Sequence, residues 1–528
     1  MGVKLLRLLL SGRKLRLRTG ELSAELVETL SLRRQLAFDS LQPAAHLVND
    51  FVSLSKGRRR LRYHCAAMPI GEVPAAMEVP LAPASETPAL DAREQRRRLS
   101  SHLAWAALVL VVALAARSFW VAYAPSDPMD GRIFSDPVFY YYSAAHLAEG
   151  GGYIQPLTGA NTAYWPPGYS LLVTGLFKVL GAHVAIAWGA NIVLGALTCV
   201  ALYYLGRLVA EWRTGVAAGL LLALFPGHVF FSSLVLSEVT FTFLVVVALL
   251  LAALAIRHRE RRTVWLLLLL GVTIGAAALV RGQGVFLIPL AALFWLLQTG
   301  WQRALRWTAL AAVAAAVVIA PWTVRNHFVM HNFVLISTNV GGNLYVGNFE
   351  GATGHRVPGA GEWAKGEYSH LPLEEQEVAM SNRLLREGLR FMFTHPGREM
   401  QLTASKVRGL YEDDEEALRG IPNRQAGEVI PHAGRIADAA NAYYFTVLAL
   451  AGGGLLVWLR RPRGALVLPL LAVAVFTLGQ LPFLTDPRFH YPMLPAFALL
   501  AAAGLVAAAG VARRALARRT ALRNIDAS

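Results

Sequence analysis

One carboxylate opens the stretch "SDPVFYYYSAAHLAEGGGY" (135–153), where Asp136 precedes a proline, three consecutive tyrosines and a short helical pattern closed by glycines. A Ser-Asp-Pro start is typical of a helix N-terminus, with Asp136 at the N-cap and Pro137 at the first helical position. A carboxylate held in place by backbone donors can also take a proton from a hydroxyl as a general base. Local rules alone favour the cap, so the second interpretation depends on what surrounds Asp136.

Further polar side chains stand at the ends of apolar segments: Glu238 in "LSEVTF", Arg281 in "LVRGQG", Arg325 in "PWTVRNH" and Arg488 in "TDPRFHYP". Arginine donors stabilise negative charge such as that of a phosphate, and an arginine beside an apolar span needs a partner. For each arginine alone, the alternative is that its head group snorkels toward lipid headgroups. Three arginines with two carboxylates favour a site for an anionic substrate, provided that the fold brings them to one face.

Composition decides what kind of fold must position these groups. The 528 residues are 55% hydrophobic and 16% charged, with a mean hydropathy of +0.44, and a soluble protein of this length needs more polar surface. The apolar residues also come in blocks of roughly 20, the length that spans a bilayer. We therefore predict an all-α polytopic membrane protein with about ten transmembrane helices, at 102–124, 185–206, 214–232, 237–256, 263–280, 282–299, 305–323, 441–459, 465–484 and 491–511.

The net charge of +16 is distributed as in a membrane protein. Lys and Arg gather in the short loops on one side and at both termini, which predicts a multi-pass protein of the cell membrane with cytoplasmic N- and C-termini. Zinc-ligand spacings and aromatic-interleaved basic strands are absent from the sequence, so nucleic acid is not an expected partner. The same register places two long loops, 125–184 and 324–440, on the outer face.

The domain organisation follows from these boundaries. Residues 1–100 form a basic, Pro/Ala-rich cytoplasmic extension that is expected to be partly disordered, although a start at Met68 or Met77 is an open alternative. Residues 101–511 form the membrane domain, and residues 512–528 form a basic cytoplasmic tail. Cys65 falls in the extension and Cys199 inside a span, so no disulfide is expected, and Cys199 is interpreted as a buried hydrophobe.

The outer loops contain segments that the membrane should hold at its surface. "PPGYSLLVTGLFKVLG" (166–181) is too short for a span, and counting it would reverse the basic loops, so it is predicted to lie in the interface. "REGLRFMFTHPGREMQLTASKVRGLY" predicts amphipathic juxtamembrane helices in the second loop. The Gly/Asn-rich "STNVGGNLYVGNFEGATG" predicts turns beside the site. "YEDDEEAL" is interpreted as a solvated acidic face.

Several motifs occur together in one order: "SDPVFYYYSAAHLAEGGGYIQPLTGANTAYWPPGYSLL", "LSEVTF", "LVRGQG", "PWTVRNHFVMHNFVLISTNVGGNLYVGNFEGATG", "THPGREMQLTASKVRGL" and "DPRFHYPMLPAFALLAAAGL". On these motifs, across about residues 100–511, the chain resembles bacterial family 39 glycosyltransferases of the GT-C fold. These are integral-membrane relatives of protein O-mannosyltransferases and of the lipid A aminoarabinose transferase. The resemblance identifies the superfamily and not the sugar.

The resemblance implies a GT-C-like fold and a sugar donor linked to a polyprenyl phosphate, used on the outer face of the membrane. The first outer loop of the family carries an acidic residue ahead of a tyrosine-containing helix and a Pro-Pro element, which Asp136 and Pro166–Pro167 match. Protein mannosyltransferases have an acidic pair there, whereas Pro137 follows Asp136, so the role of a second acid is not carried over. The implied partners are the lipid-linked donor, membrane lipids, and a glycan, lipid or protein as acceptor.

Roles for the site residues follow from this resemblance and from charge. Asp136 is the expected catalytic base that deprotonates the acceptor hydroxyl, in a single displacement with inversion. The three arginines introduced above are expected to stabilise the leaving phosphate. Glu238 and Asn343 complete the expected substrate-binding set, although turn chemistry explains Asn343 equally well.

Two questions stay open at this point. Some GT-C enzymes use a divalent cation, but Asp136 with Glu238 is too small a ligand set to assign a metal, so no cofactor is assigned and a divalent cation stays an alternative. The main rival function is a transporter or flippase of lipid-linked sugars, which should show ionisable residues near the membrane midplane and broken helices. A non-catalytic scaffold is a second rival.

Overall fold

The computed structural model describes residues 92–128, 135–258, 260–419, 430–460, 462 and 464–526. The chain divides into two units, Met1–Pro88 and Ala89–Ser528, and the description below concerns the second. The predictions for residues 1–91, Cys65 among them, lie outside the described residues.

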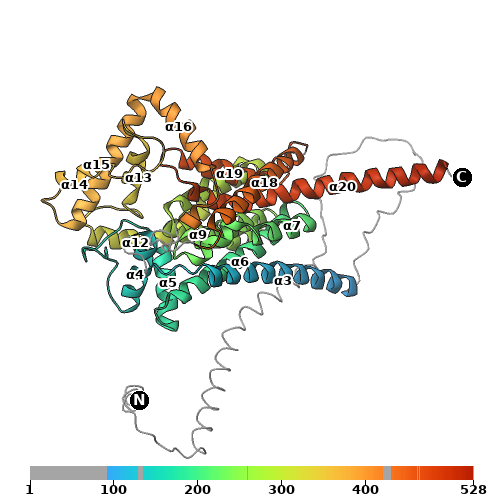
Figure 1. Cartoon of the computed structure of the whole chain (residues 1–528), viewed down its shortest axis with the longest axis horizontal. Coiled ribbons are helices and arrows are strands. Elements are labelled where there is room, and N and C mark those ends of the chain that lie inside the picture. The colour runs from blue at the N-terminus through green and yellow to red at the C-terminus, as the bar shows by residue number, and fades with distance from the viewer. Residues whose placement is uncertain are drawn as a thin grey trace, which may run out of the picture. The chain divides into compact units, whose positions relative to one another are not determined.

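Regular structure in the described residues is helical, apart from two isolated β-bridges. Figure 1 shows the long helices lying side by side in a bundle, with short helices gathered at one end of it. The helices are α3 (Ala92–Tyr123), α4 (Asp136–Ala148), α5 (Gly168–Leu180), α6 (Val184–Val209), α7 (Trp212–Ala223), α8 (Pro226–Phe230), η2 (Phe231–Ser233), α9 (Glu238–Ala255), α10 (Glu260–Val280), η3 (Gly282–Phe286), α11 (Leu287–Thr299), α12 (Trp301–Val329), α13 (Asn339–Gly347), α14 (Trp363–Glu367), α15 (Leu373–Thr394), α16 (Pro396–Leu410), α17 (Glu416–Arg419), α18 (Ala433–Leu459), α19 (Val467–Gln480), η5 (Pro487–Met493) and α20 (Leu494–Asp526).

Eight helical segments in the described residues are long and apolar enough to cross a membrane. They are α3, α6, α9, α10, η3 with α11, α12, α18, and η5 with α20. A ninth span is broken, because α7 and α8 with η2 meet at a 60° bend. The prediction of an all-α polytopic membrane protein is therefore confirmed, with eight or nine candidate spans in place of about ten.

The differences from the predicted spans lie in two places. The span predicted at 465–484 is α19, a helix of 14 residues that falls short of the length needed to cross a bilayer. The second outer loop is also shorter than the predicted 324–440, since α12 continues to Val329 and α18 begins at Ala433. The segment predicted to lie in the interface is α5, a separate helix of 13 residues, and its place at a membrane surface stays a prediction.

Close helix packing in the bundle depends on small residues. A Cβ atom at Gly215 of α7 would lie 2.3 Å from the carbonyl oxygen of Tyr203 in α6, and one at Gly206 would lie 2.8 Å from the Cα of Gly215. The two backbones therefore approach as closely as small residues allow, which is how helices associate without a hydrophobic driving force.

The bend between α7 and α8 is stabilised from the neighbouring helix α3. Arg117 of α3 is fully buried, and its Nη1 donates to the carbonyl oxygen of Ala223, 3.3 Å away at the end of α7. Its Nη2 contacts Nδ1 of His228 in α8. A broken span frees backbone carbonyls that must find donors within the protein, and Arg117 supplies one.

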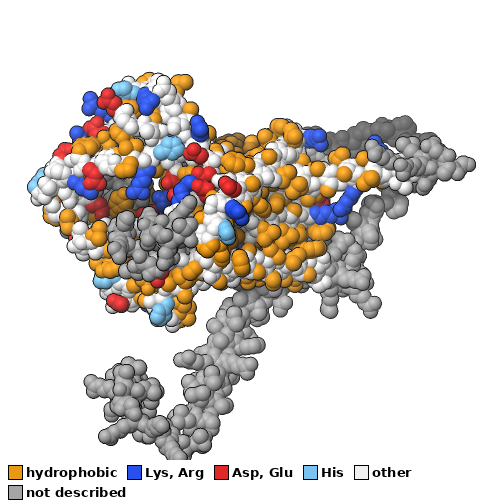
Figure 2. Space-filling view, viewed as in Figure 1, with side chains coloured by type: hydrophobic (Ala, Val, Ile, Leu, Met, Phe, Trp, Pro, Cys, Tyr) orange, Lys and Arg blue, Asp and Glu red, His pale blue; other side chains and the backbone are white. Residues whose placement is uncertain are grey.

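The second outer loop folds into a cap, which we define as α13 to α16. The cap lies at the end of the bundle near α4 and α12 (Figure 1). Figure 2 shows hydrophobic side chains covering the bundle, whereas many acidic and basic side chains gather over the cap and where it meets the bundle. This contrast is the one expected between lipid-facing and water-facing surfaces.

Glu377 of α15 joins the two outer loops. Its carboxylate accepts hydrogen bonds from Thr162 Oγ1 at 2.6 Å, from the Ala163 backbone N–H at 3.0 Å, and from Thr338 Oγ1 at 2.7 Å. Burial raises the pKa of Glu377, although these hydrogen bonds and the charge of Arg325 oppose the shift. The cap therefore holds the segment that follows the Asp136 helix.

Replacing Glu377 with alanine should loosen the first outer loop. The variant leaves the Thr162 hydroxyl and the Ala163 N–H without their partner, and hydrogen bonds to charged groups contribute about 2 kcal/mol each. We expect backbone amides in 153–165 to exchange with solvent at least ~10-fold faster, measured by hydrogen-exchange mass spectrometry in nanodiscs.

Glu375→Ala is the matched control, since Glu375 also lies on α15 and is half-buried. Equal exchange in the two variants would show that Glu377 does not hold the loop.

Candidate active site

Asp136 lies at the first position of α4, with Ser135 as the N-cap residue and proline directly after it. The predicted N-cap assignment is therefore wrong by one residue, and α4 has no side-chain cap hydrogen bond. Because the Asp136 carboxylate does not cap the helix, both of its oxygens are available to bind side chains from other elements. The capping interpretation of Asp136 fails on this geometry.

The carboxylate of Asp136 is held by two side chains from distant segments. Oδ2 lies 3.0 Å from Nη1 of Arg488, and Oδ1 accepts a hydrogen bond from Nε1 of Trp165 at 3.2 Å. Burial alone would raise the pKa of Asp136, but the charge and hydrogen bond of Arg488, with the Trp165 bond, lower it below the ordinary value. Asp136 is therefore ionised, and its side chain remains 32% exposed.

Aromatic rings set the position of this carboxylate. The Trp165 ring stacks on Phe139, with centroids 3.9 Å apart, and Phe139 is fully buried one turn after Asp136. Tyr140 of the same turn is also buried, and its hydroxyl lies 3.5 Å from Ser237 Oγ. Burial raises the pKa of Tyr140, so its hydroxyl stays protonated. The tyrosine-rich helix thus contributes packing as well as surface.

Arg488 lies in η5, directly before the last membrane helix. Asp486 caps η5 by accepting a hydrogen bond from the Arg488 backbone N–H at 3.1 Å. Its carboxylate also lies 4.0 Å from Nε of Arg488. The Arg488 side chain is 23% exposed, although its Nε is buried.

A second ion pair joins Glu238 and Arg281, with Oε1 and Nη1 2.7 Å apart. Glu238 is the first residue of α9 and is almost fully buried, whereas the Arg281 side chain is 17% exposed. Nη1 of Arg281 also donates to Ser237 Oγ at 3.1 Å. A buried carboxylate is tolerated because this guanidinium neutralises it.

The two ion pairs meet at the ring of Phe489. Cζ of Arg281 lies 5.7 Å from the ring centroid and Cζ of Arg488 lies 5.3 Å from it. The fold thus brings together four of the six predicted site residues, Asp136, Glu238, Arg281 and Arg488. Two partly exposed arginine side chains beside an ionised carboxylate can bind an anion and accept a proton.

Arg325 has a different environment. Its Nη1 donates to the carbonyl oxygen of Thr162 at 2.9 Å, and its Nη2 donates to that of Tyr153 at 3.1 Å. Its guanidinium also lies over the ring of Trp322. Arg325 therefore binds the backbone of the first outer loop and is not part of the cluster around Phe489.

Asn343 lies in α13 and contacts the site through its backbone. Its carbonyl oxygen accepts a hydrogen bond from the Leu484 N–H at 3.0 Å. Nearby, the Asn348 side chain donates to the carbonyl oxygen of Pro482 at 2.6 Å and accepts from the buried Nζ of Lys406, also at 2.6 Å. The cap is thereby attached to the segment that leads into η5.

Sequence reasoning missed Glu377, Lys406 and Asp414, and one interpretation that it made is wrong. The "YEDDEEAL" segment is not a solvated face, because Asp414 is 5% exposed. Its neighbours Asp413, Glu415 and Glu416 all bind Arg419, at distances of 2.8 to 2.9 Å. The signal in the sequence was Arg419 itself, three to six residues after those acids.

The site offers a poor ligand set for a divalent cation. Both oxygens of Asp136 already accept from N–H donors, and the Glu238 carboxylate faces a guanidinium. Within the described ranges, no group of three or more His, Cys, Asp or Glu side chains is placed to hold a metal ion. We therefore derive no catalytic step through a metal.

Comparison with known proteins finds one family. Residues 165–324 match the family model described as dolichyl-phosphate-mannose-protein mannosyltransferase. This segment contains Glu238 and Arg281 and ends one residue before Arg325, whereas Asp136 and Arg488 lie outside it. No curated protein sequence matches the chain.

Solved structures similar to this one include two kinds of membrane protein. One is the oligosaccharyltransferase AglB from Archaeoglobus fulgidus in complex with an inhibitory peptide and a dolichol-phosphate, at 19% identity and a TM-score of 0.47, over 80% of this chain and 52% of that one. Another is ArnT from Cupriavidus metallidurans bound to undecaprenyl phosphate, at 18% identity and a TM-score of 0.38, over 76% of this chain and 78% of that one. The chain thus spans about half the length of the oligosaccharyltransferase that it matches.

The family match falls on the central spans, where the ordered motifs "LSEVTF" and "LVRGQG" also lie. The resemblance to the mannosyltransferases is therefore confirmed for this part of the chain. Residues 165–324, less than a third of the chain, are thus similar to the family described as dolichyl-phosphate-mannose-protein mannosyltransferase.

Proposed function

We propose that this protein is a membrane glycosyltransferase that moves a sugar from a polyprenyl-phosphate-linked donor to an acceptor hydroxyl. The observation that carries the proposal is the pairing of an ionised, partly exposed carboxylate, Asp136, with the partly exposed side chain of Arg488. The match to a family described by a lipid-linked mannose supports the class of donor. The acceptor is a hydroxyl of a glycan, a lipid or a protein.

The arginines act on the leaving group. As the bond between the anomeric carbon and the phosphate oxygen breaks, its electron pair stays on the polyprenyl phosphate. The guanidinium groups of Arg488 and Arg281 both lie near the Phe489 ring, at 5.3 and 5.7 Å from its centroid, and in this proposal both donate to the donor phosphate. Preorganised donors aimed at developing charge are commonly the largest contribution to catalysis.

Asp136 acts on the acceptor. The acceptor oxygen forms its bond to the anomeric carbon while its proton passes to the Asp136 carboxylate, so the step needs no other acid or base. A displacement in one step inverts the anomeric centre. The ionised state of Asp136 in the free protein is the state that a general base requires.

Donor binding should exchange one anion for another at Arg488. Without donor, the carboxylate of Asp136 occupies Nη1 of Arg488 at 3.0 Å, as a phosphate oxygen would. When the phosphate takes this place, Asp136 loses the neighbouring positive charge that lowers its pKa and gains a negative neighbour. The pKa of Asp136 then rises, which makes it a stronger base at the moment of reaction.

The remaining predicted residues support this arrangement. Glu238 holds Arg281 in place and partly neutralises it, so we assign it a positioning role. Arg325 fixes the loop between Tyr153 and Thr162 and Asn343 anchors the cap through its carbonyl. For these two we propose structural support of the site in place of direct substrate contact.

Sidedness follows from charge. The basic short loops predict that the bundle end carrying α4 and the cap faces outward, with both termini in the cytoplasm. The polyprenyl tail would then lie among the spans, with its phosphate at the outer surface of the cell membrane.

A transporter of lipid-linked sugars is the second candidate, favoured by the broken span α7–α8 and by the buried pair of Arg117 and His228. Both features were expected of a transporter. However, Arg117 is completely enclosed and donates to protein acceptors at Ala113 and Ala223. It therefore stabilises the break, and the site with accessible charge is the one at Asp136.

Asp136→Asn should abolish transfer while leaving donor binding intact. The amide keeps the shape of the carboxylate but cannot take a proton, and general bases contribute about 100-fold or more to the rate. We expect kcat to fall by at least about 100-fold for transfer of labelled sugar from a panel of polyprenyl-phosphate donors, with purified protein in nanodiscs.

Asp127→Asn changes another described carboxylate of the same loop and serves as the control. Undiminished transfer by a folded Asp136→Asn variant would remove Asp136 from the mechanism. If wild-type protein moves the labelled lipid between leaflets without any transfer, the transporter is correct.

The pH dependence of the reaction should differ between the free and the donor-bound protein. An ordinary Asp side chain has a pKa of about 4, and the pKa of Asp136 is lower. The carboxylate of Asp136 therefore stays ionised at every pH above about 4 and takes up a proton only at lower pH. We expect kcat/KM, which reports the free protein, to stay flat from about pH 7 to about pH 5.

The acid limb of kcat, which reports the donor complex, should lie at higher pH because the phosphate displaces Asp136 from Arg488. Coincident acid limbs in the two profiles would contradict this exchange. Stopped assays with a saturating and a limiting donor concentration separate the two constants.

A further inference from the structure

The short helix η5 carries Arg488 and His490, two residues apart, between α19 and α20. The Arg488 side chain forms part of the candidate site, whereas His490 is 2% exposed and points into the protein. The position of η5 therefore decides where the Arg488 guanidinium lies relative to Asp136.

His490 is bound on both ring nitrogens. Nδ1 lies 2.9 Å from the carbonyl oxygen of Leu410, which only accepts hydrogen bonds, so this nitrogen carries a proton. Nε2 lies 3.2 Å from Oδ1 of Asp414, and that contact needs one further shared proton. The ring stacks on Tyr444 at a centroid distance of 4.9 Å, so its orientation is fixed.

Asp414 also binds the broken span. Its Oδ2 accepts a hydrogen bond from the backbone N–H of Gly227 at 3.0 Å, in α8 directly after the bend. A Cβ atom at Gly227 would lie 2.1 Å from Oδ1 of Asp414, so this approach requires glycine. A buried carboxylate from the second outer loop thus joins α8 to η5.

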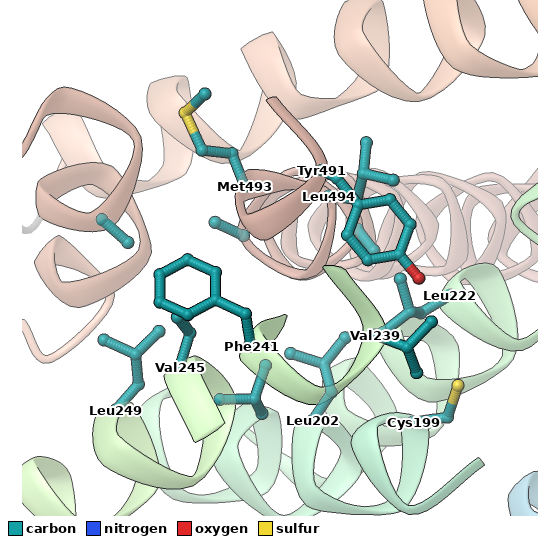
Figure 3. Packing of buried hydrophobic residues seen from close by; sticks show 14 of the residues in the cluster. Cys199, Leu202, Leu222, Val239, Phe241, Val245, Leu249, Tyr491, Met493 and Leu494 are labelled. Carbon is teal, nitrogen blue, oxygen red and sulfur yellow. The ribbon is translucent and has the colours of Figure 1, made fainter. Parts of the chain in front are cut away.

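A second connection runs beside the first. The Tyr491 hydroxyl donates to the carbonyl oxygen of His228 at 3.3 Å, and the two rings stack 5.1 Å apart. Figure 3 shows Tyr491, Met493 and Leu494 among the buried side chains of the core, near Val239 and Phe241 of α9. The C-terminal half of η5 is therefore held by packing, and Asp414 contributes a buried polar contact to His490, two residues after Arg488.

We propose that Asp414 is a positioning residue that acts through His490 to hold Arg488 in the geometry that binds the donor phosphate. The inference rests on the proposed function and deepens it, because it assigns control of the phosphate-binding arginine to a carboxylate outside the site. Misplacement of a catalytic group by about 1 Å can cost about 100-fold in rate, so a buried contact two residues away is sufficient to matter.

The test compares two substitutions of the same residue in the full-length protein in nanodiscs. Asp414→Ala removes both contacts, whereas the amide of Asp414→Asn can still accept from the Gly227 N–H and donate to Nε2 of His490. We expect Asp414→Ala to weaken binding of undecaprenyl phosphate and to raise KM for the donor, each by about 10-fold or more. Asp414→Asn should stay within about threefold of wild type.

A double-mutant cycle separates positioning from general destabilisation. In an Arg488→Ala background, Asp414→Ala should have no further effect on undecaprenyl phosphate binding, because the group that it positions is absent. Asp438→Ala, an exposed aspartate on α18, is the matched control and should bind as wild type does. If Asp414→Ala does not fold, His490→Asn removes the same contact from the other side and takes its place in the cycle.

Three results would overturn the inference. The first is that Asp414→Ala binds undecaprenyl phosphate as well as Asp438→Ala does. The second is that Asp414→Ala weakens undecaprenyl phosphate binding as much in the Arg488→Ala background as it does in the wild type. In both cases wild-type protein still binds and transfers, so the proposed function survives. A wild-type protein that neither binds undecaprenyl phosphate nor transfers sugar overturns the proposed function and this inference together.

Discussion

The ion pair between Asp136 and Arg488 joins side chains 352 positions apart in the chain, and the arrangement of the candidate site depends on it. Neither partner could be held so close to the other by local structure. The first outer loop supplies the carboxylate and the segment before the last span supplies the guanidinium. Each must be fixed by its own contacts, because an ion pair that is partly open to water contributes little free energy of its own.

Those contacts are formed largely by the second outer loop. Glu377 and Arg325 hold the loop that follows α4, through backbone groups near Thr162. On the other side, Asn343, Asn348 and Gly354 bind the segment from Pro482 to Thr485. The cap thus orders both partners of the ion pair without contributing either of them.

The sequence was sufficient for the all-α membrane fold and for most of the spans, because these follow from local properties. It also predicted four residues that the fold brings together, Asp136, Glu238, Arg281 and Arg488, and their roles stay predictions. Apolar length identifies a span, and an arginine at the outer end of an apolar segment is unusual enough to indicate a partner. It was not sufficient for Glu377, Lys406 and Asp414, each of which binds a segment far away in the chain. Thr162 lies 215 positions from Glu377, Gly227 lies 187 from Asp414, and Asn348 lies 58 from Lys406. The run of acids around Asp414 was predicted to be solvated because composition does not report burial. Asp136 was predicted to be an N-cap because helix propensity cannot place the start of a helix to within one residue.

The short helix α19 has a consequence for the membrane around the protein. Its 14 residues rise about 21 Å, whereas the hydrocarbon core measures about 30 Å. One side of α19 is exposed at Leu478, and its last residue, Gln480, binds Gln283, two positions after Arg281. A helix of this length does not match the hydrocarbon core by itself, and a bilayer accommodates such a mismatch by thinning, by snorkelling of flanking residues or by protein association. The acyl-chain length of the surrounding lipids therefore affects how well the bilayer fits this side of the bundle, at α19. Membranes built from shorter or longer lipids are not equivalent environments for the protein.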